Sequence, residues 1–263
     1  HFARTRGKPK GYLSIVFQAD CHAAGSPKVE GHPMSKQLGI LFKPEMVRAI
    51  LEGRKTQTRR VIKSDANNIY WNPIMLGGKY GWTDEHGYRV KCNWRIGDYL
   101  YVRETWGVGT RPDPFQGWID GIEYRADEAY LDEHDDLPLN PVAEFDYGSY
   151  TKTGWQPSLF MPKIISRIWL KVTNVRVERL LDISDDDAIA EGIDCCDRPT
   201  GGDDYVDYYR DYMQPPKGDD GWPWIEGYPN KSYFSLWDSI NGAGSHQLNP
   251  WVWVIEFERC EKP

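Results

Sequence analysis

The segment Gly53-Arg54-Lys55-Thr56-Gln57-Thr58-Arg59-Arg60 gathers two hydroxyls, one lysine and three arginines within eight residues. A threonine hydroxyl is a weak nucleophile unless a neighbouring base takes its proton. Lysine can be that base when burial or nearby cations lower its pKa towards neutrality. Side chains three apart point to opposite faces of a plain strand, so Lys55 and Thr58 can meet only if the chain bends between them. The alternative interpretation is a solvated basic turn, which composition alone favours.

A short helix is predicted directly before this segment. Pro44 suits its first turn, and Gly53 is a plausible C-terminal stop. Four apolar residues between them share one helical face: Met46, Val47, Ile50 and Leu51. The segment from Lys55 to Arg60 therefore directly follows the end of a helix, where such a bend can form.

A second helix is predicted over Asp185 to Glu191. Ser184 is a good N-cap, with Asp187 three residues later, and Gly192 can end the helix. Glu191 then lies at a helix C-terminus, where a negative charge is mildly unfavourable. That position suits a working carboxylate, although surface glutamates at helix ends are common.

Strands account for most of the remaining pattern. Gly97-Asp98 predicts a turn that leads into a strand from Tyr99 to Trp106, and a strand with a phase break near Asn174 is predicted over Ile168 to Val177. In the last strand, Trp251, Trp253, Ile255 and Phe257 alternate with Val252, Val254, Glu256 and Glu258. The sequence thus favours an α+β fold that is rich in strands.

Three segments depart from these elements. Residues 1–33 lack periodicity and are interpreted as a fused or disordered leader, so a chain that starts at Met34 should fold; the alternative is a native arm that packs on the domain. Residues 34–263 are then a single domain. Two insertions are expected within it: residues 107–160, rich in Gly, Pro, Asp and Trp, and residues 194–230, interpreted as a long loop or lid.

Composition limits the class of protein. The charge of −7 over 263 residues argues against a dedicated nucleic-acid coat. Five cysteines without C-x-x-C spacing favour a reducing, cytoplasmic setting, and no apolar run is long enough to span a membrane. The histidines have no ligand-like spacing, and phosphate-loop and dinucleotide motifs are lacking, so neither a metal nor a cofactor is predicted.

The pattern Gly53-x-Lys55-x-x-x-x-Arg60 after a short helix resembles the signature of ASCH domains, which belong to the PUA-like superfamily. Gly97-Asp98-x-Leu100-x-Val102, Ala190-Glu191-Gly192 and the strand Trp251 to Phe257 resemble further elements of that family, in the expected order. The resemblance implies a PUA-like β-barrel with short flanking helices. It covers roughly residues 38–62, 94–106, 164–193 and 234–258.

Among ASCH enzymes, the chain is most similar to the bacterial N(4)-acetylcytidine amidohydrolases, which share Gly-Arg-Lys-Thr-x-Thr-x-Arg. The resemblance implies that Lys55, Thr58 and Glu191 form the catalytic set and that N(4)-acylcytidines are hydrolysed to cytidine and a carboxylic acid. The partner would be a small nucleoside. Because both insertions are rich in Trp and Tyr, we expect bulky aroyl groups to be accepted alongside acetyl.

Four more residues are candidates for substrate binding. Arg60 could hold Glu191 or a nucleoside oxygen, although a solvated arginine is an equal alternative. Arg103, Glu104 and Trp106 could line a pocket in which Trp106 stacks on the base, whereas a buried core tryptophan is the commoner explanation.

The competing function is an RNA-binding module or a ribonuclease. Residues 35–63 hold eight Lys or Arg and two Glu, a local charge of +6, which favours RNA. The acidic insertions count against it. A third reading, a purely structural or interaction protein, predicts that Lys55→Ala changes no chemistry.

Overall fold

The structure is a computed structural model that describes residues 35–64, 67–72, 81–115, 117–132, 145–147, 154–199, 205–215, 221 and 223–263. These residues contain many short strands and three α-helices, which confirms a strand-rich α+β fold. The predicted leader, residues 1–33, lies outside the described residues.

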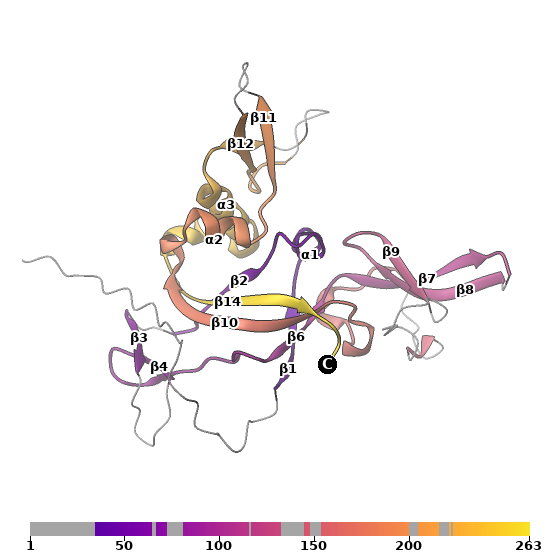
Figure 1. Cartoon of the computed structure of the whole chain (residues 1–263), viewed down its shortest axis with the longest axis horizontal. Helices are drawn as coiled ribbons and strands as arrows, with labels where there is room; N and C mark the ends of the chain where they lie inside the picture. Colours follow the sequence, from indigo (N-terminus) through magenta and orange to yellow (C-terminus); the bar gives the residue numbers. More distant parts are fainter. Residues whose placement is uncertain are drawn as a thin grey trace, which may run out of the picture. The chain divides into compact units, whose positions relative to one another are not determined.

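A five-stranded sheet forms the centre of the described residues, with the strand order β1-β6-β10-β14-β2 (Figure 1). β1 runs parallel to β6, and the other pairs are antiparallel. Among the described strands β1 and β2 are the two edges of this sheet, so these strands form no closed barrel. The bounds are β1 Gln37–Leu41, β2 Gln57–Val61, β6 Tyr99–Arg103, β10 Trp169–Arg179 and β14 Trp251–Cys260.

The long antiparallel pair β10 and β14 follows the predicted pattern. The register shifts between Val172 and Asn174, which confirms the phase break near Asn174. β6 ends at Arg103, earlier than predicted, and a new strand begins at Trp106. In β14, residues 252–255 are all buried in the main apolar cluster, so both faces of the strand are covered there, and apolar side chains occupy both.

Three smaller antiparallel sheets complete the described strands. One is formed by residues 106–132 and has its own apolar cluster around Trp106 and Tyr124. Another lies in residues 194–230, so the prediction of a long loop there was wrong: strand pairing supplies backbone hydrogen bonds that a loop would lack. The bounds are β7 Trp106–Asp113, β8 Gly117–Tyr124 and β9 Ala129–Asp132; β11 Cys195–Pro199, β12 Tyr205–Arg210 and β13 Trp224–Glu226; β3 Ile69–Asn72, β4 Gly81–Asp84 and β5 Arg89–Val90.

The three α-helices are α1 Pro44–Leu51, α2 Asp185–Ala190 and α3 Pro229–Asn241. The first two confirm the predictions. α1 buries Met46, Val47 and Ile50, and in α2 the Ser184 hydroxyl accepts a hydrogen bond from the Asp187 amide at 3.1 Å. α3 was not predicted. No helix among the described residues is long and apolar enough to cross a membrane.

Candidate functional site

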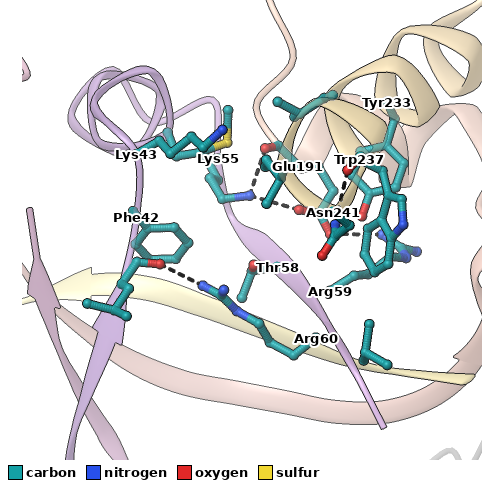
Figure 2. A pocket seen from close by; sticks show the side chains of 15 residues that line it. Phe42, Lys43, Lys55, Thr58, Arg59, Arg60, Glu191, Tyr233, Trp237 and Asn241 are labelled. Atoms are coloured by element: carbon teal, nitrogen blue, oxygen red, sulfur yellow. Dashed lines mark hydrogen bonds and ion pairs between the residues drawn. The ribbon is translucent and has the colours of Figure 1, made fainter. Parts of the chain in front are cut away.

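A pocket of about 150 Å³ brings together residues from α1, β2, α3 and the end of α2 (Figure 2). Lys55, Thr58, Arg60 and Glu191, all predicted from the sequence, line it. None of the described residues of 107–160 or 194–230 does, so the expected contribution of the insertions to this pocket is not found. The remaining lining residues are Leu41, Phe42, Lys43, Met46, Arg59, Val61, Tyr233, Leu236, Trp237, Ile240 and Asn241.

Two helix ends hold Lys55 in place. The Lys55 amide donates to the Ala49 carbonyl of α1 at 3.0 Å, and Lys55 forms an isolated antiparallel bridge with Glu191, just after α2. β2 begins only at Gln57, so the chain changes course between Lys55 and Thr58 and both residues reach the pocket. The bend that would bring the two side chains into contact stays a prediction.

Lys55 and Glu191 form an ion pair inside the protein. Lys55 Nζ donates to Glu191 Oε2 at 2.8 Å and to the Glu191 carbonyl oxygen at 2.7 Å. Their side chains are 2% and 4% exposed. Burial lowers the pKa of Lys55 below its usual range, although the Glu191 carboxylate works in the opposite direction; the nearby guanidinium groups lower it further. A lysine in this position is easier to deprotonate than one in water.

Arg59 binds the other oxygen of the same carboxylate and was missed as a site residue. Its Nη1 donates to Glu191 Oε1 at 3.1 Å, while Nη2 donates to Asp187 at 2.9 Å and to Glu178 at 3.0 Å. One signal was available in the sequence. Asp187 and Glu191 are four residues apart, so two carboxylates lie on one helical face. A cation is expected to pair with them.

Thr58 and Arg60 follow Lys55 along β2. Thr58 is 5% exposed and lines the pocket, and within the described residues its hydroxyl makes no hydrogen bond. Arg60 makes no hydrogen bond or ion pair with Glu191 among the described residues, contrary to one of the two predictions; it donates to the Leu41 carbonyl at 2.8 Å. Its guanidinium and the Lys55 ammonium both lie over the Phe42 ring, at 5.3 and 5.6 Å from the centroid. The ring face attracts both cations, although they still repel each other: the Arg60 charge helps to lower the Lys55 pKa.

The other three predicted binding residues do not reach this pocket. Arg103 donates to the backbone carbonyls of Leu159 and Met161. Glu104 is 1% exposed and forms a bidentate ion pair with Arg167, with N···O distances of 3.0 and 2.9 Å. Trp106 is fully buried in the apolar cluster of the β7–β8 sheet, so the core explanation holds and stacking on a base does not.

α3 supplies an apolar wall that sequence reasoning missed. Tyr233, Leu236, Trp237 and Ile240 line the pocket at the spacing of one helical face, followed by Asn241. The same spacing was the available signal. Tyr233 is buried near Glu191, and burial together with that carboxylate raises its pKa well above the usual range, so its phenol stays protonated.

Among the described residues no cluster of three or more His, Cys, Asp or Glu could hold a metal ion. Comparison with protein-family models, with curated proteins and with solved structures finds no match. The site therefore has to be interpreted from its own geometry and chemistry.

Proposed function

We propose that the chain is an amidohydrolase that cleaves the amide of N(4)-acylcytidines at the Lys55 pocket. The observation that carries the proposal is the buried Lys55–Glu191 ion pair beside the Thr58 hydroxyl. A buried ion pair is a weak source of stability because both charges lose their water. Strongly perturbed titratable groups in a concave site are, in contrast, typical of catalytic centres.

The reaction proceeds in two balanced steps. Lys55, as the free amine, takes the proton of the Thr58 hydroxyl while Thr58 Oγ1 bonds to the acyl carbon. The bond from the acyl carbon to N4 then breaks, and the lysine ammonium returns the proton to the leaving amine of cytidine. Water hydrolyses the resulting acyl-threonine ester, which releases the carboxylic acid and restores the hydroxyl.

Glu191 and Arg59 position the base in this scheme. Glu191 fixes Lys55 through its carboxylate and its carbonyl, and Arg59 holds the second carboxylate oxygen. Both therefore keep the amine directed into the pocket. Preorganised charges of this kind act without the reorganisation that water would need.

The walls suit a substrate with an apolar acyl group and a flat ring. Leu236, Trp237 and Ile240 of α3 give an apolar side, and Asn241 offers an amide oxygen at the same end of the helix. The cavity is smaller than the roughly 300–1,000 Å³ of typical ligand pockets. We therefore infer that it takes the acyl group and the base edge, with the ribose outside.

We also propose that the central sheet with α1 and α2 corresponds to the ASCH domain of the PUA-like class. The support is the order of the elements: α1, the Lys55 segment, the Gly97-Asp98 entry to β6, the α2 end at Glu191 and the closing strand β14. A cytoplasmic location remains a prediction from the cysteine pattern.

RNA binding at the Lys55 segment is less favoured by the contacts. Three of the eight cations in residues 35–63 are held in ion pairs: Lys55 and Arg59 pair with carboxylates inside the protein. Arg54 pairs with Glu52 and Asp194. These cations are then not free to contact phosphates, which is the interaction that dominates nucleic-acid affinity.

Substitutions at Thr58 test the proposed nucleophile. Thr58→Ala removes the hydroxyl and should abolish release of cytidine from N(4)-acetylcytidine, with unchanged far-UV circular dichroism. Thr58→Ser keeps a hydroxyl and should retain measurable turnover. Near-normal turnover of Thr58→Ala would end the acyl-threonine route and leave a water activated by Lys55 as the mechanism.

A further inference from the structure

A second, larger cavity of about 510 Å³ lies outside the Lys55 pocket. It is formed by the end of β2 and the residues after it, by the β4–β5 hairpin and the residues that follow, and by Trp253 of β14. Val61 at the end of β2 lines both cavities, so the groove opens beside the Lys55 pocket. Its lining residues are Val61, Ile62, Lys63, Ser64, Asp84, Arg89, Val90, Lys91, Asn93, Trp94 and Trp253.

The groove is positively charged, and within the described residues its cations are not held in ion pairs. Lys63, Arg89 and Lys91 are exposed, and within the described part of the chain none of them forms an ion pair or a side-chain hydrogen bond. Among the described lining residues, Asp84 alone is acidic. One of its oxygens already accepts hydrogen bonds from the amides of its own turn, at His86 (2.9 Å) and Tyr88 (2.7 Å). Three cations thus face one partly occupied carboxylate.

The floor of the groove is apolar and aromatic. Trp253 is 3% exposed and packs edge-on against Trp82, with ring centroids 5.9 Å apart. Trp94 is half-buried at the side, next to the exposed amide of Asn93. An aromatic surface beside cations and an amide matches a ligand that joins an anion to a flat polar ring.

We propose that this groove binds the phosphate of a nucleotide-class ligand, with the base against Trp94 and Asn93. Lysines bind phosphate as point charges, and arginine binds it through two parallel N–H groups. The three cations Lys63, Arg89 and Lys91 therefore fit the charge and the several oxygens of a phosphate better than they fit a ligand with a single carboxylate. The site is distinct from the Lys55 pocket and does not depend on the amidohydrolase activity. The phosphate can come from a free nucleotide or from a single-stranded RNA.

Calorimetric titration of the full chain tests this groove. The probes are cytidine 5′-monophosphate, inorganic phosphate, a short single-stranded oligoribonucleotide and uncharged cytidine. We expect cytidine 5′-monophosphate to bind more tightly than cytidine at low salt and to weaken as salt rises, which cytidine does not. Lys63→Gln, Arg89→Gln and Lys91→Gln should each raise its Kd about tenfold, the size of one charge-assisted hydrogen bond.

The matched control is Lys171→Gln, which removes one exposed positive charge from β10 without touching the groove. It should leave the Kd unchanged, and all variants should keep the wild-type circular dichroism spectrum. Tighter binding and a steeper salt slope for the oligoribonucleotide would identify RNA as the source of the phosphate; equal affinity would identify a single nucleotide. The proposal is overturned if cytidine binds as well as its monophosphate, or if the three groove variants match Lys171→Gln.

Discussion

Lys55 Nζ lies 2.8 Å from a carboxylate oxygen of Glu191 and 2.7 Å from the carbonyl oxygen of the same residue. Two parts of one residue thus bind the ammonium, and the isolated bridge between the two backbones keeps them together. Removing one partner of a buried pair typically costs about 3–5 kcal/mol. Substitutions here therefore have to be assessed for stability as well as for activity.

The pH dependence of turnover should identify Lys55 as the base. A base acts in its deprotonated form, so log kcat/KM rises with pH through the lowered Lys55 pKa. The Glu191 charge and its hydrogen bond both raise that pKa. In Glu191→Gln the rising limb should therefore move to lower pH, while kcat should fall on the order of 10²-fold because Lys55 loses the carboxylate that positions it.

Glu178→Gln is the control for this profile. Glu178 contacts Arg59 but is not among the groups that shift the Lys55 pKa. Its rising limb should coincide with that of the wild type. A limb that moves to higher pH in Glu191→Gln would contradict the assignment of Lys55 as the titrating group.

Gly192 lets Lys55 pack closely against the end of α2. A methyl group at Gly192 would lie 2.7 Å from Lys55 Cβ and 2.8 Å from Ala49 Cβ, at a backbone φ of +81°. We expect Gly192→Ala to lower the free energy of unfolding by about 1–2 kcal/mol through backbone strain and by about 1–3 kcal/mol more through overpacking. Displacement of Lys55 should also lower turnover, on the order of 10²-fold per ångström.

Gly53→Ala is the matched control, because Gly53 has a φ of +77° but no atom within 4 Å of the added methyl. It should show the backbone strain alone, with turnover close to the wild type. Urea denaturation and initial rates measure both effects. Equal losses in the two variants would mean that the close approach to Lys55 has no functional role.

Arg59 should act as a positioning residue. Its side chain is completely buried against three carboxylates, so Arg59→Gln should cost about 3–5 kcal/mol and lower kcat with little change in KM. Arg54→Gln removes an arginine that is 34% exposed and should cost about 0–1 kcal/mol. Arg59→Lys keeps the charge and should fold more stably than Arg59→Gln. A rise in KM without loss of kcat would instead place Arg59 in uniform substrate binding.

Elements with local signals could be predicted, and contacts between distant segments could not. The cap at Ser184 and the apolar face of α1 are encoded within a few residues, and both were found. Arg59 was missed because its partners Glu178, Asp187 and Glu191 lie more than one hundred residues away in the chain. Its place on β2 gave no indication of them.

Trp106 and α3 show the same limit. A tryptophan at a strand start suits a binding pocket or a core, and only the packing of β7 on β8 decides for the core. The spacing of Tyr233, Leu236, Trp237 and Ile240 was a local signal for α3. It went unnoticed because the Gly- and Pro-rich residues before it favoured a continuing loop.

The central claim is tested most directly by incubating the chain with N(4)-acetylcytidine and measuring cytidine and acetate. The account predicts that both products accumulate in equal amounts, and that Lys55→Arg is about as inactive as Lys55→Ala because arginine cannot act as a base near neutral pH. Thermal unfolding of each variant shows that the protein is folded in the assay. No release of cytidine by the wild-type chain, or equal release by Lys55→Ala, would contradict the account.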